Sequence, residues 1–157
     1  MEKLEAILEK YNSLQLNGVI GFDKFLGYTI VHHSSGIEGS TLTEKESQLL
    51  LDEGITPKGK PLEHSLMVKD HYGALLFVLS EAKKKRTITV PLLREINSLV
   101  MKSTGKVWNT VLGKIDESKG EFRKGNVRAG ESYFVSYDKV IPYTTELVKS
   151  LNKKSRW

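Results

Sequence analysis

The sequence contains no cysteine and only four prolines among its 157 residues. Without cysteine there is no disulfide, thiolate zinc site, iron–sulfur cluster or cysteine nucleophile. There is also no run of roughly 18 to 20 apolar residues, the length that crosses a bilayer. The first residues are amphipathic and acidic, unlike a secretory signal peptide. We therefore expect a cytoplasmic protein that makes no membrane contact.

Hydrophobic residues make up 39% and charged residues 27% of the chain, which is typical of one globular domain. The net charge of +5 is unevenly spread, because residues 1–80 hold 7 Lys/Arg and 11 Asp/Glu whereas residues 81–157 hold 17 and 8. The second half is a candidate surface for an anionic partner such as a nucleotide, a nucleic acid or an acidic protein. A solvated basic face explains the same excess equally well.

Apolar residues recur at the helical spacing of three and four in most of the chain. We expect the first two helices to break near Asn17-Gly18. Thr43 followed by Glu46 forms a capping box that starts a short third helix, and Gly54 ends it. Thr89 is expected to cap the fifth helix. The apolar stripes of the other helices are Leu4 to Tyr11, Phe22 to Ile30, Val68 to Leu79 and Val140 to Leu151. The stripe from Val68 to Leu79 is the strongest and predicts the central core helix.

The pattern changes between Gly113 and Tyr137, where glycines recur and β-prone aromatic clusters appear. These clusters are Glu121–Arg123 and Tyr133–Tyr137, and they predict a β-hairpin or an extended flap. The sequence therefore predicts a mainly helical fold with a small β-hairpin.

Four histidines, at positions 32, 33, 64 and 71, raise the question of a metal site. Neighbouring side chains on a helix point about 100° apart, so His32 and His33 cannot share one ion. His64 and His71 lie two turns apart, which is also too far for a shared ligand. We expect no metal site, and a surface or capping role for His64 and His71.

The most informative string runs from His33 to Thr43. Within it, Ser34, Glu38 and Gly39 match the pattern Ser/Thr-x-x-x-Glu-Gly/Asn of the self-inhibited members of the Fic (filamentation induced by cAMP) family. The sequence resembles this family of protein adenylyltransferases further downstream, in order, and over essentially the whole chain. The resembling segments are Leu62-Glu63, Tyr72–Ala74, Thr89–Asn97, Gly120–Arg123 with Val127, and Tyr133–Val140.

The resemblance implies that Glu38 pairs with an arginine of the catalytic motif, which would otherwise bind the γ-phosphate of ATP. An Arg–carboxylate pair is charge-assisted and often bidentate, so it competes directly with Arg–phosphate contacts. Ser34, one helical turn earlier, would lie on the same face, and Gly39 would let the chain leave the helix in a left-handed turn. Without the downstream likeness, this segment reads as a loop with an exposed glutamate.

The resemblance also implies a flap that pairs with an extended segment of the target protein by adding a strand. Five consecutive residues fit this docking role, although ordinary hairpin packing would explain any one of them. They are Tyr133, Phe134, Val135, Ser136 and Tyr137.

The family's catalytic signature, His-Pro-Phe-x-x-Gly-Asn-Gly-Arg-x-x-Arg, does not occur in these 157 residues. The segment from Gly120 to Arg128 resembles it, but Gly120 replaces the basic histidine, Lys124 the acidic position and Val127 a phosphate-contacting glycine. We expect residues 1–84 to be the N-terminal region with the inhibitory helix. Residues 85–157 would then be the first part of the Fic core, including the flap and ending before the catalytic motif.

Three functions stay open. The first is the N-terminal part of a self-inhibited adenylyltransferase, inactive alone, whose complete form uses ATP and Mg²⁺ and modifies a protein substrate. The second is a non-catalytic module that uses Glu38 to restrain a second Fic chain in trans. The third, a nucleic-acid-binding module, is the least expected. The expected partners are the target protein and the remainder of the Fic core or a second Fic chain, and a homodimer is also open.

Overall fold

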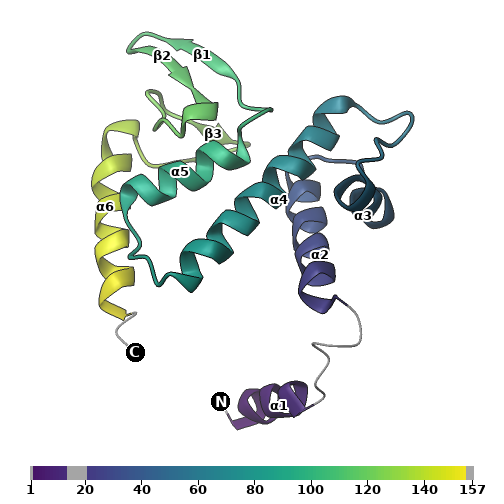
Figure 1. Cartoon of the computed structure of the whole chain (residues 1–157). Helices are drawn as coiled ribbons and strands as arrows, with labels where there is room; N and C mark the ends of the chain where they lie inside the picture. The colour runs from purple at the N-terminus through teal and green to yellow at the C-terminus, as the bar shows by residue number, and fades with distance from the viewer. Residues whose placement is uncertain (1, 14–20, 155–157) are drawn as a thin grey trace.

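The structure is a computed structural model that describes residues 2–13 and 21–154, so the expected break near Asn17-Gly18 lies outside the described residues. The fold is mainly helical with two small β-hairpins, as the sequence predicted (Figure 1). Across the described residues, no helix is both long and apolar enough to cross a membrane. The helices are α1 (Glu2–Ser13), α2 (Phe22–Ile37), α3 (Glu44–Glu53), α4 (Leu62–Lys83), α5 (Val90–Val100) and α6 (Tyr137–Lys154).

The long helix α4 lies at the centre of the molecule and joins its two sides (Figure 1). Helix α4 packs on α2 and α3, and it also packs on α5. Helix α5 in turn contacts α6. The buried apolar cluster lies where α2, α3 and α4 meet, and it consists of Val31, Leu42, Leu50 and Val68. This cluster fixes the direction in which the end of α2 points.

Local capping chemistry places the ends of α3 and α5 where the sequence predicted them. Thr43 accepts a hydrogen bond from the Glu46 backbone N–H at 3.2 Å, and the Glu46 carboxylate accepts one from the Thr43 N–H at 2.8 Å. Gly54 ends α3 with a left-handed φ of 72°. Thr89 caps α5 by accepting from the Leu92 N–H at 3.2 Å. All of these interactions join residues within four positions of one another, which is why sequence alone could locate them.

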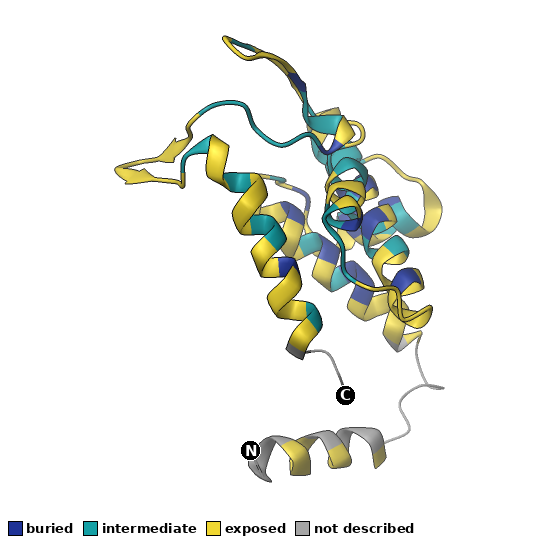
Figure 2. Ribbon diagram, turned by 90° about the vertical axis from the view of Figure 1, so that its left-hand side faces the viewer, coloured by how far each residue is buried: buried dark blue, intermediate teal, exposed yellow. Residues whose placement is uncertain are grey.

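The apolar stripe of α4 is only partly a core stripe. Val68 is fully buried, and Tyr72 and Leu75 pack against the cluster, but Leu76 and Leu79 are each 49% exposed. Figure 2 shows buried residues concentrated in the helices around the cluster, while α6 is largely exposed. The expectation that Leu76 and Leu79 belong to the core was therefore wrong.

The β structure differs from the prediction in its extent. One hairpin pairs β1 (Val107–Thr110) with β2 (Gly113–Asp116), and the other pairs β3 (Arg128–Ala129) with β4 (Ser132–Tyr133). The first therefore begins before the expected start at Gly113, and the β-prone residues 121–123 form no strand.

The residues after Gly120 form a turn because their side chains bind nearby backbone groups. Gly120 ends the short 3₁₀ helix η2 (Glu117–Lys119) with a φ of 59°, which redirects the chain. Glu121 then accepts from the Asp116 N–H at 2.9 Å, and Arg123 donates to the Gly125 carbonyl at 2.7 Å. These bonds fix the segment between the two hairpins without making it a strand.

Candidate functional site

The motif at the end of α2 forms a helix C-terminus that is open to solvent. Ser34, Glu38 and Gly39 are all exposed, and Glu38 is the C-cap residue with a φ of −82°. Gly39 leaves the helix with a φ of 99°, a region that side chains other than glycine rarely adopt. Its N–H donates to the carbonyl of Gly36 at 3.1 Å. The chain thus turns away directly after Glu38 and leaves its carboxylate uncovered.

Glu38 lines an open hollow of about 470 Å³ between the end of α2, the start of α4 and the β1 side of the first hairpin. Glu63 and Glu117 also line it, and Lys106 is its one lysine. Within the described residues, the Glu38 carboxylate forms no hydrogen bond and no ion pair, and its electrostatic partner is His71. Three carboxylates facing one lysine favour a cationic occupant.

Glu117 is held in place, unlike Glu38. One oxygen of its carboxylate accepts from Trp108 Nε1 at 2.7 Å, and the other accepts from the Lys106 backbone N–H at 2.9 Å. The wall of the hollow formed by the first hairpin is therefore fixed by two charge-assisted hydrogen bonds. Sequence reasoning did not identify these three residues, and nothing local in the sequence connects them with Glu38.

Of the two serines near the end of α2, Ser35 and not Ser34 contacts α4. Ser35 is fully buried, and its Oγ lies 2.8 Å from Nδ1 of His71 on α4. A signal for this was present in the sequence, because Tyr28, Val31 and Ser35 follow the i, i+3, i+7 spacing of one inward helix face. The hydrogen bond attaches the end of α2 to α4 beside the hollow.

The expected surface or capping role of His71 is wrong, because its ring is half-buried against Ser35. Burial lowers the pKa of His71 below its usual value, and the nearby carboxylates of Glu38 and Asp70 oppose this effect. His64, the other histidine of α4, accepts a hydrogen bond from the Thr41 N–H at 3.2 Å. Both histidines therefore connect α4 to the segment around the motif.

The lowered pKa of His71 predicts a loss of stability in mild acid. The unfolded state, with a histidine pKa of about 6.5, binds a proton more readily than the folded state. The contribution is therefore present above about pH 6.5 and is lost as the pH falls toward the lower folded pKa. Urea unfolding at pH 7.5 and pH 5.5 should show a smaller pH effect for His71→Gln than for the wild type. The exposed His33 provides the control, and an unchanged pH effect in His71→Gln would count against this assignment.

The expected flap lies on β4 and the segment that follows it. Tyr133 is in β4 and is 79% exposed, Phe134 and Val135 are also exposed, and Tyr137 is the first residue of α6. The Phe134 N–H donates to the Val127 carbonyl at 3.1 Å, which continues the pairing beyond β4. Ser136 lies between the hairpin and α6. The segment presents exposed aromatic side chains beside a short strand pair.

Two side chains anchor this segment from the preceding turn. The Arg123 guanidinium donates to the carbonyl of Val135, and the Asn126 side-chain oxygen accepts from the Tyr137 N–H at 3.1 Å. The flap and the motif are separate surfaces, since none of residues 133–137 lines the hollow beside Glu38.

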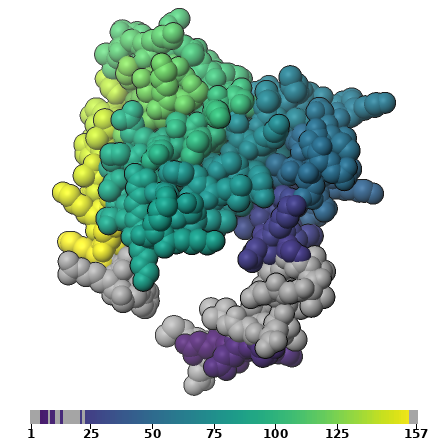
Figure 3. Space-filling model, in the orientation of Figure 1, coloured from purple at the N-terminus to yellow at the C-terminus, as the bar shows by residue number. Residues whose placement is uncertain are grey.

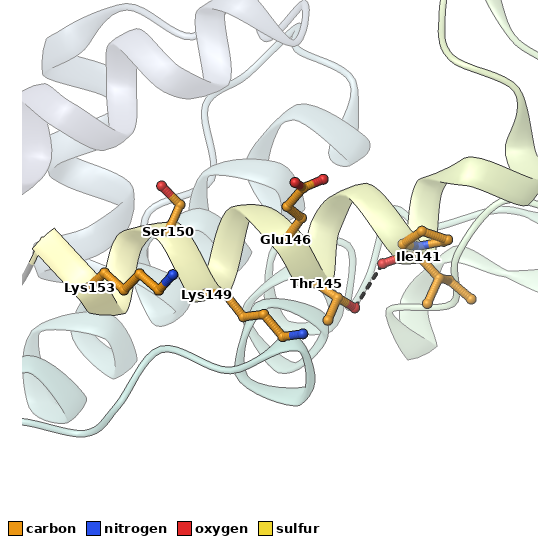
Figure 4. A pocket seen from close by; sticks show the side chains of 7 residues that line it. Ile141, Thr145, Glu146, Lys149, Ser150 and Lys153 are labelled. Atoms are coloured by element: carbon orange, nitrogen blue, oxygen red, sulfur yellow. Dashed lines mark hydrogen bonds between the residues drawn. The ribbon is translucent and has the colours of Figure 1, made fainter.

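A second concavity, of about 690 Å³, lies along the outer face of α6 (Figure 4). All of its lining residues belong to this one helix, among them Thr145, Lys149 and Lys153. A single helix surface cannot enclose a ligand as a binding pocket does. Within the described part of the chain, no three His, Cys, Asp or Glu side chains are grouped as metal ligands.

Comparison with known proteins identifies a structural relative. The solved structure of a Fic domain-containing signaling protein from Bacteroides thetaiotaomicron VPI-5482 matches with a TM-score of 0.77 and 22% sequence identity. The match covers 96% of this chain and 56% of that chain, so this chain spans little more than half the length of its relative. No protein-family model and no curated protein sequence matches it. At this identity the likeness shows the fold alone. Nearly the whole of this chain resembles about half of the Fic domain-containing protein.

Proposed function

We propose that this chain is the regulatory and target-docking part of a Fic-type protein adenylyltransferase. In this proposal Glu38 restrains the nucleotide site by pairing with a catalytic arginine, and the β3–β4 hairpin with Phe134 to Tyr137 docks the target protein. The likeness in fold to the Fic domain-containing protein supports the proposal.

The position of Glu38 is the observation that carries the proposal. Its carboxylate stands at an exposed helix end on the rim of a hollow, without a hydrogen-bond or ion-pair partner among the described residues. The surrounding carboxylates of Glu63 and Glu117 increase the preference for a positive group there. An arginine from another segment would satisfy Glu38 by a bidentate pair.

The residues of the hollow do not suit ATP and Mg²⁺ by themselves. A triphosphate would face the carboxylates of Glu38, Glu63 and Glu117 with Lys106 as its one lysine. No glycine lines the hollow, and the first turn of α4 contributes to it the carboxylate of Glu63, which would repel a phosphate. In this proposal the nucleotide therefore binds to the remainder of the Fic core and not to the residues of this hollow.

Apolar side chains are exposed on three helices, which supports the proposal that a further polypeptide binds there. The remainder of a Fic core, or a second Fic chain acting in trans, would cover part of this surface. The apolar residues are Leu26, Ile30, Ile37, Leu76, Leu79, Ile141, Tyr143 and Leu147.

Labelled-AMP transfer tests the proposed function. Purified residues 1–157 should incorporate no AMP from α-labelled ATP into themselves or into added lysate proteins, because they lack the His-Pro-Phe signature whose histidine is the family's general base for a target hydroxyl. The product of the complete reading frame, or this chain copurified with a Fic partner, should incorporate AMP. Transfer by the 157-residue chain alone, or no transfer in either complete preparation, would contradict the proposal.

A further inference from the structure

The two outer edges of the first hairpin differ in their hydrogen bonding: among the described residues, side chains bind backbone groups on the β2 edge but not on the β1 edge. On the β2 side, Lys124 Nζ donates to the Lys114 carbonyl at 2.9 Å, and the Asp116 N–H donates to the Glu121 carboxylate at 2.9 Å. These side chains occupy the Lys114 C=O and the Asp116 N–H, which are among the backbone groups through which β2 would pair with another strand. The β2 edge is therefore blocked.

The register shows that the β1 edge is not blocked in this way. Asn109 lies opposite Lys114 and Val107 lies opposite Asp116. In an antiparallel pair, opposite residues direct their backbone groups either both toward the partner strand or both away from it. The N–H and C=O groups of Val107 and Asn109 therefore point away from β2. In residues 2–13 and 21–154, no other group forms a hydrogen bond with them.

The open edge also carries exposed apolar side chains. Val107 and Trp108 are about half exposed, Leu112 is 53% exposed, and Val111 at the hairpin tip is fully exposed. Figure 2 shows this hairpin extending from the helices with a mostly exposed surface, and Figure 3 shows the hairpin region raised above α5. Proteins commonly protect edge strands with charges, prolines or covering segments. An apolar, uncovered edge beside a blocked one is typical of a site for strand addition.

We propose that the β1 edge binds an extended peptide segment of a partner protein as a third strand. The edge is only four residues long, about 13 Å at the usual rise per residue. Such an edge is too short for the 1,200 Å² or so that stable dimers bury, so a short linear peptide fits it better than a second copy. Alternating apolar residues would pack on Val107 and the tip.

The charge of the hairpin indicates which peptides the edge would prefer. Lys114, which lies opposite Asn109, is exposed on the hairpin, and its side chain has no ion pair among the described residues. A peptide with a carboxylate beside its apolar residues would therefore bind more tightly than a basic one. The inference does not depend on AMP transfer, and it concerns a different hairpin from the β3–β4 flap.

Two variants at one position test the edge. Asn109→Pro removes the outward N–H without removing a β1–β2 hydrogen bond, and proline is tolerated at such edge positions. Asn109→Ala keeps the N–H and is the matched control. The probe is a displayed library of linear eight-residue peptides selected on the full chain. The selected peptides should be apolar and acidic, should bind the wild type and Asn109→Ala equally, and should bind Asn109→Pro at least tenfold more weakly.

A backbone readout and a second variant complete the test. Peptide binding should slow hydrogen exchange at the amides of Val107 and Asn109, and thermal melting should confirm that the variants fold. Should Asn109→Pro not fold, Val107→Glu should give the same tenfold loss, because it places on the edge a negative charge that repels an acidic peptide. Enrichment of no peptide, equal binding to Asn109→Pro, or protection at Tyr133 to Tyr137 would overturn the proposal. So would a dimer that Asn109→Pro dissociates, because the edge would then belong to a second copy.

Discussion

Replacing Glu38 with glycine in the product of the complete reading frame is expected to raise AMP incorporation by about tenfold or more. The proposed Arg–carboxylate pair is charge-assisted, and such hydrogen bonds contribute roughly 1.5–3 kcal/mol. Each 1.4 kcal/mol or so corresponds to a factor of ten in an equilibrium. Removal of the carboxylate would free the arginine for phosphate. The measurement is automodification with α-labelled ATP.

The structure indicates that this substitution leaves the fold intact. Glu38 is an exposed C-cap residue whose φ of −82° any residue adopts, and its side chain forms no hydrogen bond within the described residues. Its loss would instead lower the pKa of His71 further, because the Glu38 carboxylate opposes the effect of burial on that ring. An NMR titration of His71 would show this change even if the activity did not change.

Matched controls separate charge from position. Glu38→Gln keeps the size of the side chain and removes its charge, so it should activate nearly as strongly as glycine. Glu53 is likewise an exposed glutamate at the C-terminal end of a helix, α3, but it lies outside the hollow. Glu53→Gln should leave the activity unchanged. Equal activity of the wild type and both Glu38 variants would contradict the inhibitory role.

The features of the fold that the sequence predicted correctly depend on neighbouring residues. The Thr43–Glu46 capping box, the Thr89 cap and the glycine end of α3 each involve interactions within one or two helical turns. Apolar periodicity likewise identified the six helices, because burial of one face is a property of each helix by itself. It could not say how much of α4 would find a partner, which is why Leu76 and Leu79 were wrongly assigned to the core.

The features that could not be predicted depend on groups that meet only in the folded chain. The first hairpin has strands of four residues, and side chains that follow it in the sequence, Glu121 and Lys124, hold one of its edges. The bond between Ser35 and His71 joins residues 36 positions apart. The motif located Glu38, but the hollow around it needs Lys106 and Trp108 from a hairpin whose extent the pattern did not predict.

Replacing Gly120 with alanine is expected to cost about 3 kcal/mol or more of the free energy of unfolding. Gly120 has a φ of 59°, and a left-handed conformation costs an L-residue roughly 1–2 kcal/mol. A Cβ at this position would also lie 2.1 Å from the backbone oxygen of Arg94, and overpacking of this kind costs about 1–3 kcal/mol. Relief would require α5 and the turn to separate, which breaks the 2.8 Å bond from Arg94 Nε to the Gly120 carbonyl.

Two other glycines in the same region separate the two causes of this effect. Gly130 also has a positive φ, 57°, but a Cβ there would meet nothing within 4 Å, so Gly130→Ala should cost only the conformational part. Gly125 has neither a positive φ nor a close neighbour, so Gly125→Ala should be close to neutral. Urea unfolding should therefore rank the losses Gly120, Gly130, Gly125. Equal losses for Gly120→Ala and Gly130→Ala would mean that the contact with Arg94 relaxes without cost, and that α5 does not hold the turn between the hairpins.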